Sequence, residues 1–122
     1  MPEKEQPLAG PDIAMRLEAL TAWTFEDGAI RRTYKTDGWR GSMLVANAIA
    51  FICEAADHHA DLTVTWPSVG VALSTHSAGG ITAKDFEVAG LIEKQVTWKP
   101  GKDSSLVGLK KPFVIPHPSS LA

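Results

Sequence analysis

Histidines are the side chains in this sequence best suited to moving protons. Three of the four, His58, His59 and His76, fall within residues 54–85. The first two follow an apolar run with helical spacing, and the third follows a run of alternating, strand-like residues. A neutral imidazole near neutral pH both gives and takes protons. Because side chains at the ends of rigid elements can converge on one cleft, we predict a general acid/base site here.

Two other interpretations of these histidines stay open. Zinc also binds histidine and carboxylates such as Asp57 and Asp61, but the sequence has no spacing typical of a zinc motif, so we expect no metal. Adjacent histidines after a helix can also do no more than complement the negative end of the helix dipole. His117 lies between prolines and is assigned to solvent. The sequence carries no nucleophile motif, phosphate loop or dinucleotide fingerprint, so proton transfer without a bound cofactor fits best.

Apolar periodicity predicts the elements that position these residues. Helical spacing predicts helices over 12–20, 39–57 and 82–96, and alternation predicts strands over 23–25, 29–36, 62–66 and 69–75. Asp27-Gly28 and Pro67-Ser68 are typical of tight turns between paired strands. Runs of hairpins separated by helices predict an α+β fold, in the order α-β-β-α-β-β-α. We expect a four-stranded antiparallel sheet with the helices packed on one face.

Length and composition predict one globular domain with two added ends. The chain has 122 residues, of which 44% are apolar and 21% charged. Residues 1–10 are polar and predict a flexible tail, residues 11–97 form the domain, and residues 98–122 form an extension rich in Pro, Gly, Ser and Lys. The net charge of −2 and pI near 6.0 argue against a broad nucleic-acid or membrane surface. A single cysteine and the lack of an apolar leader predict a cytoplasmic protein.

The helix over 39–57 is apolar nearly all round. Val45 and Ile49 lie on one face, and Leu44 and Phe51 lie on another. One small sheet covers only one of these faces, so we predict that a second subunit covers the other, in a homodimer or homotetramer. The alternative is that small alanines make a solvent-exposed face look apolar. Residues 43–56 and the extension are also the expected contacts for any protein partner.

The central stretch resembles the pterin-4a-carbinolamine dehydratase family, which is also known for a dimerisation-cofactor role with a transcription factor. The loop over residues 74–82 resembles the family's Thr-His-x-x-Gly-Gly/Leu-Thr loop, and the resemblance extends over residues 12–97. The residues in register with the family pattern are Glu54, His58, His59, Trp66, His76 and Asp85.

The resemblance implies dehydration of 4a-hydroxytetrahydropterin, the tetrahydrobiopterin 4a-carbinolamine, to quinonoid dihydropterin and water. It assigns catalysis to His58, His59 and His76. It assigns substrate binding to Trp66, Ser74 and Thr75, and support of the histidine loops to Glu54, Asp57 and Asp85. No cofactor is implied.

Three residues depart from the family pattern. Ala60 replaces a proline, Leu62 replaces a tryptophan and Pro67 replaces an asparagine, and we expect these positions to line the pocket. The alternative is therefore a catalytically inactive relative that binds or assembles other proteins, such as a Rubisco assembly factor or a coactivator-like protein.

Overall fold

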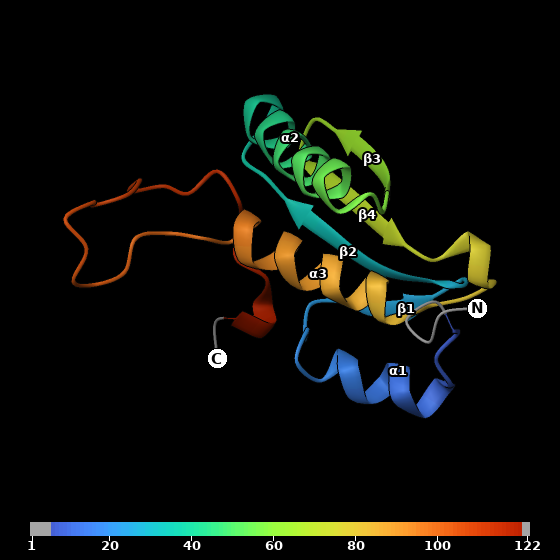
Figure 1. Cartoon of the computed structure of the whole chain (residues 1–122). Helices are drawn as coiled ribbons and strands as arrows, with labels where there is room; N and C mark the ends of the chain where they lie inside the picture. The colour runs from blue at the N-terminus through green and yellow to red at the C-terminus, as the bar shows by residue number, and fades with distance from the viewer. Residues whose placement is uncertain (1–5, 121–122) are drawn as a thin grey trace.

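Four antiparallel strands form one sheet in the order β1-β2-β4-β3, as the computed structural model shows for residues 6–120. The predicted α+β order is confirmed (Figure 1). The helices are α1 (Gly10–Leu17), α2 (Trp39–Ala56) and α3 (Ala83–Val96). The strands are β1 (Thr24–Glu26), β2 (Ala29–Lys35), β3 (Asp61–Thr65) and β4 (Ser68–Leu73), and short 3₁₀ turns lie at η2 (His76–Ala78) and η3 (Pro118–Ser120).

Alternation along the strands gives the sheet one covered face and one open face. Helices α2 and α3 lie side by side over the covered face, and α1 lies beside β1 (Figure 1). The core residues that β2 and β4 send to this face include Ile30, Tyr34, Val69, Val71 and Leu73. The open face carries small or polar side chains, since Arg31 pairs with Ala72 and Thr33 pairs with Gly70. A ligand on this face would therefore rest on a shallow floor.

Both predicted turns are present. Asp27 and Gly28 have φ values of 50° and 75°, as a type I′ turn between β1 and β2 requires. Trp66 and Pro67 form the turn between β3 and β4, whose register ends with Thr65 opposite Ser68. Apolar residues fall at even positions before Pro67 and at odd positions after it, and this change therefore marks a hairpin turn.

The first residues of the domain are more ordered than the predicted tail. Helix α1 begins at Gly10 rather than Asp12, and the Leu8 N–H donates to the Ile81 carbonyl at 2.8 Å. Leu8 also packs against the core, because the loop after β4 offers it both a backbone acceptor and an apolar neighbour. Leu8, within the segment predicted as a tail, thus has a contact with the domain. Residues 1–5 lie outside the described part.

The C-terminal extension has a projecting part and a docked part. After α3, residues 98–112 run away from the sheet and return (Figure 1). Val114 then bridges to Thr36, and the Ile115 N–H donates to the Lys35 carbonyl at 2.8 Å. This part of the extension therefore packs against the end of β2.

A polar network joins β2 to α3. Glu93 accepts hydrogen bonds from the Tyr34 hydroxyl at 2.7 Å, Trp23 Nε1 at 2.9 Å and Arg32 Nε at 3.1 Å. Burial on its own would raise the pKa of Glu93, but the hydrogen bonds from Arg32, Tyr34 and Trp23 outweigh it and hold that pKa below its usual value. Burial, together with Glu93, raises the pKa of Tyr34 well above its usual value. The network thus fixes an ionised Glu93 against a buried guanidinium.

In the described part of the chain, no helix is both long and apolar enough to cross a membrane.

Candidate active site

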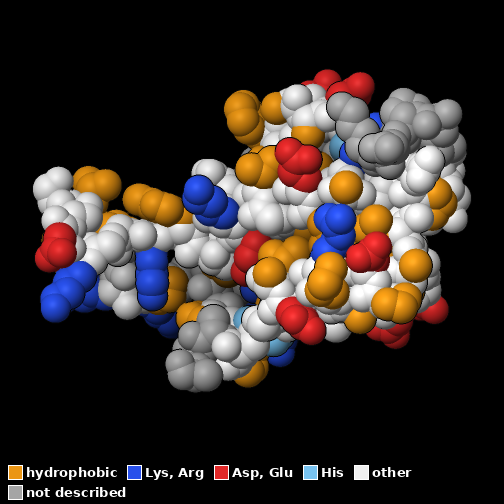
Figure 2. Space-filling view, turned by 60° about the horizontal axis from the view of Figure 1, so that its bottom comes forward, with side chains coloured by type: hydrophobic (Ala, Val, Ile, Leu, Met, Phe, Trp, Pro, Cys, Tyr) orange, Lys and Arg blue, Asp and Glu red, His pale blue; other side chains and the backbone are white. Residues whose placement is uncertain are grey.

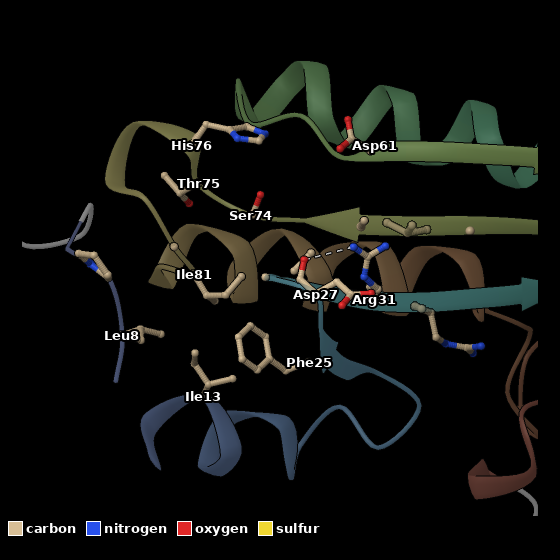
Figure 3. A pocket seen from close by; sticks show the side chains of 18 of the residues that line it. Leu8, Ile13, Phe25, Asp27, Arg31, Asp61, Ser74, Thr75, His76 and Ile81 are labelled. Carbon is tan, nitrogen blue, oxygen red and sulfur yellow. Dashed lines mark hydrogen bonds between the residues drawn. The ribbon is translucent and has the colours of Figure 1, made fainter. Parts of the chain in front are cut away.

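Ser74, Thr75 and His76 line a cavity at the end of β4. The cavity has a volume of about 720 Å³, which lies within the range of small-molecule sites. The His76 ring points across its mouth toward Asp61, the first residue of β3 (Figure 3). The start of β3 and the end of β4 thus bring an imidazole, a carboxylate and the Ser74 hydroxyl to one hollow.

Asp85 connects this hollow to His58. Its Oδ1 lies 2.6 Å from His58 Nε2, and its Oδ2 accepts hydrogen bonds from the Thr75 hydroxyl at 2.8 Å and the Thr82 N–H at 2.9 Å. The last of these bonds closes the capping box of α3, a pattern that Thr82 and Asp85 give at the start of the helix. One carboxylate therefore begins a helix, anchors the loop after β4 and holds a histidine.

The Asp85 carboxylate is buried, so it needs its hydrogen-bond partners. The Asp85 side chain is 0% exposed, and that of His58 is 13% exposed. A buried carboxylate is tolerated only when its oxygens are hydrogen-bonded, and here three donors reach it. The Asp85 carboxylate accepts, so the His58 ring donates to it from Nε2. The carboxylate thus fixes the orientation of the ring.

His59 has a different partner from His58, and both residues follow the end of α2. Its Nε2 is 2.9 Å from Glu54 Oε1, and both side chains are more than half exposed. Asp57 is the C-cap of α2 and has a left-handed φ of 52°, so it turns the chain toward the histidines. Glu54 therefore holds His59, whereas Asp57 acts on this loop through its backbone.

Trp66 is not brought to this site. It lies in the β3–β4 turn, at the opposite end of β4 from Ser74, roughly 25 Å away at the rise of a strand. Ala60 and Leu62 pack against the core instead of lining the cavity, and Pro67 shares the distant turn with Trp66. None of the three departures lines this cavity within one chain, and neither does His58 or His59. The role of Trp66 in binding stays a prediction.

Sequence reasoning missed the other side of the cavity. Arg31 lines it from β2, and Phe25 and Ile13 line it with apolar surface (Figure 3). The Arg31 Nε donates to the Glu26 carbonyl at 2.8 Å, and its Nη2 lies 3.5 Å from the Asp27 carbonyl. The only signal was parity, which placed Arg31 opposite to the core-facing Ile30. Within residues 6–120, no group of three or more His, Cys, Asp or Glu side chains is arranged to hold a metal ion.

Comparison with known proteins gives consistent matches. The model of the family described as pterin 4 alpha carbinolamine dehydratase matches residues 6–95. A candidate pterin-4-alpha-carbinolamine dehydratase of Roseiflexus castenholzii is 40% identical over 83 residues, which cover 68% of this chain and 89% of that protein. One of Aquifex aeolicus, also named as a candidate, is 39% identical over 89 residues, covering 73% and 90%. The crystal structure of a transcriptional coactivator/pterin dehydratase from Brucella melitensis matches with a TM-score of 0.71 and 26% identity, covering 76% of this chain and 100% of that one.

Proposed function

Because the chain belongs to the pterin-4a-carbinolamine dehydratase family, we propose that it dehydrates 4a-hydroxytetrahydropterin to quinonoid dihydropterin, in tetrahydrobiopterin recycling. The observation that carries the proposal is the buried Asp85, which links His58 to the loop that presents His76 to the cavity. Hydro-lyase activity is what the names of the relatives suggest. A cytoplasmic location and the absence of a cofactor are parts of the same proposal.

The reaction needs one proton donor and one proton acceptor. The C4a–O bond breaks as an acid protonates the departing hydroxyl, which leaves as water. The N5–H bond gives its proton to a base, and its electrons form the C4a=N5 double bond. Each well-placed acid or base contributes roughly 10²–10⁴-fold. His76 and His59 serve as the transfer pair in this proposal, and His58 orients the substrate or shares the role of acid.

Asp85 is a positioning residue in this scheme. It reaches no solvent, so it acts on the substrate through His58 and Thr75. Its contact with His58 Nε2 leaves the Nδ1 edge of that ring to meet the pterin. Ser74 supplies a hydroxyl beside His76 for the polar edge of the pterin ring, while the Thr75 hydroxyl is engaged with Asp85.

The test is the rate of carbinolamine loss with purified protein. Wild-type protein should speed the reaction, and His76→Ala should remove most of that effect. His117→Ala is the matched control, because His117 lies on the C-terminal segment and does not line the cavity. A wild-type rate equal to that of buffer would rule out the proposal.

A second candidate function is a binding or assembly role without catalysis. The projecting segment 98–112 favours it, because Val107 is 97% exposed and Leu106 and Leu109 are also exposed. Apolar and lysine side chains gather along this segment (Figure 2). This candidate predicts a partner that is lost when residues 98–112 are shortened, while pterin binding is absent in the intact protein.

We also propose that a second copy of the chain covers α2. Phe51 is 75% exposed, and Leu44 and Met43 lie exposed on the same helix. Large apolar side chains gathered on a surface helix are typical of an interface. A homodimer or homotetramer built on this face fits the sequence expectation.

A further inference from the structure

The cavity beside His76 continues past the proposed reaction centre to Arg31. Ala72 pairs with Arg31 across the sheet and lies two residues before Ser74, which is about 7 Å along the strand. Gly70 and Ala72 form a floor with almost no side chain, so nothing blocks the way along the open face. The labelled Arg31 side chain lies on this path (Figure 3). If a flat ring binds beside His76, the part of the cavity near Arg31 remains open for a substituent of that ring.

The charge of Arg31 is available to a ligand. Within the described residues it forms no ion pair, because Glu26 and Asp27 meet it with their backbone carbonyls. Arg32, its neighbour on the opposite face, shows the contrast, since its guanidinium is paired with Glu93. A half-buried guanidinium without a carboxylate partner favours an anion.

The two carbonyl contacts also hold Arg31 in place. They engage Nε and Nη2, and they fix the plane of the guanidinium at the edge of the cavity. A fixed guanidinium loses little side-chain entropy when an anion binds. Asp61 lines the same cavity from β3, two strands from Arg31, so the two Cα atoms lie roughly 10 Å apart at the spacing of strands. That separation leaves Arg31 as the positive end of the cavity.

We propose that Arg31 binds an acidic group on the C6 substituent of the pterin, a carboxylate or a phosphate monoester. This inference rests on the proposed function for the identity of the ring. It makes the substrate a pterin with an anionic side chain rather than a neutral one. Arg31 is then the residue that sets this specificity, while the histidines act on the ring.

The test measures the binding of stable oxidised pterins that differ only at C6. Pterin-6-carboxylate is compared with neutral 6-hydroxymethylpterin, and neopterin monophosphate is compared with neopterin, by quenching of pterin fluorescence. Wild-type protein should bind at least one anion about tenfold or more tightly than its neutral partner, as a charge-assisted hydrogen bond predicts. The pair with the larger ratio of anionic to neutral affinity shows whether Arg31 prefers a carboxylate or a phosphate monoester.

Arg31→Gln should reduce that ratio to about one while leaving the affinity for the neutral ligand within about twofold. Arg40→Gln is the matched control, because Arg40 is exposed on α2 outside the cavity, and it should keep the wild-type ratio. The proposal would be overturned if wild-type protein bound the anionic and neutral ligands equally, or if it bound none of the four pterins. It would also be overturned if Arg31→Gln kept the wild-type affinity ratio. If wild-type protein dehydrates the neutral carbinolamine but does not prefer anionic pterins, the proposed function stands and only this inference is overturned.

Discussion

Asp85→Asn is the most informative change, because it keeps the shape of the side chain and replaces one oxygen by an amide. Three donors reach the wild-type carboxylate, from His58, Thr75 and Thr82. If the amide oxygen faces Thr75 and Thr82, the NH₂ group meets His58 Nε2. The ring must then lose that contact or present Nε2 as an acceptor, and either change disturbs how His58 meets the substrate.

The magnitude follows from the bonds that change. The capping contact to Thr82, typically worth about 1 kcal/mol, survives in this orientation. The charge-assisted bond to His58 is lost, and bonds to charged groups contribute about 1.5–3 kcal/mol. We therefore expect the free energy of unfolding to fall by about 1.5–3 kcal/mol, measured by urea titration, without loss of the fold. The same change should lower kcat by roughly 10²-fold, because a general acid/base group is misaligned.

The assay pairs stopped-flow dehydration with urea unfolding on the same preparation. Asp12→Asn is the control, since Asp12 also lies in the first turn of a helix but is exposed. It should alter neither quantity. A stability loss in Asp85→Asn with a wild-type kcat would mean that the carboxylate only caps α3, and the argument for a positioned His58 would fail.

Three further predictions concern stability, assembly and the distant turn. Glu93→Gln should destabilise the protein by about 2 kcal/mol near neutral pH, because it removes the charge facing buried Arg32. The pKa of Glu93 is lower in the folded chain, so the stabilisation by its charge is complete above the pKa of the unfolded state and disappears as pH falls through the folded pKa. The difference in unfolding free energy between wild type and Glu93→Gln should therefore shrink in acid. Glu87→Gln, at an exposed position, should show no such difference at any pH. Wild-type protein should sediment as a dimer or larger, and Phe51→Asp as a monomer. Pro67→Asn should leave kcat/KM within about twofold of wild type, because the turn lies at the far end of the sheet.

Each of these results can contradict its premise. An acid-independent difference for Glu93→Gln would mean that the network does not depend on the ionised carboxylate. A wild-type protein that sediments as a monomer at micromolar concentration would refute the proposed interface on α2. A large loss of activity in Pro67→Asn would place the turn, and Trp66 with it, at a substrate site completed by another subunit.

The sequence predicted the elements well because their signals are local. The apolar spacing of residues 39–57 and the capping box at Thr82 each depend on neighbours within a few residues, and the structure has α2 and α3 there. The hairpin turns were also predictable, since Asp27-Gly28 suits positive φ and the parity of apolar residues changes at Pro67. These features need no knowledge of what lies across the sheet.

The site was harder to predict because it depends on pairing between distant segments. Asp85 was expected to support the histidine loops, but its contact with His58 spans 27 positions and follows only from the packing of α2 against α3. Arg31 was not recognised at all, because its place in the cavity depends on the register of β2 with β4. Leu8 was assigned to a tail for the same reason, since its partner Ile81 lies far along the chain.

The three departures from the family pattern weigh differently once they are located. They motivated the non-catalytic alternative because the sequence suggested that they line the pocket. Ala60 and Leu62 instead pack against the core, and Pro67 lies in the turn at the other end of the sheet, whereas His76 and Thr75 line the cavity. Substitutions at positions that pack against the core act mainly on stability. The case for a non-catalytic protein is therefore best tested on the exposed segment 98–112.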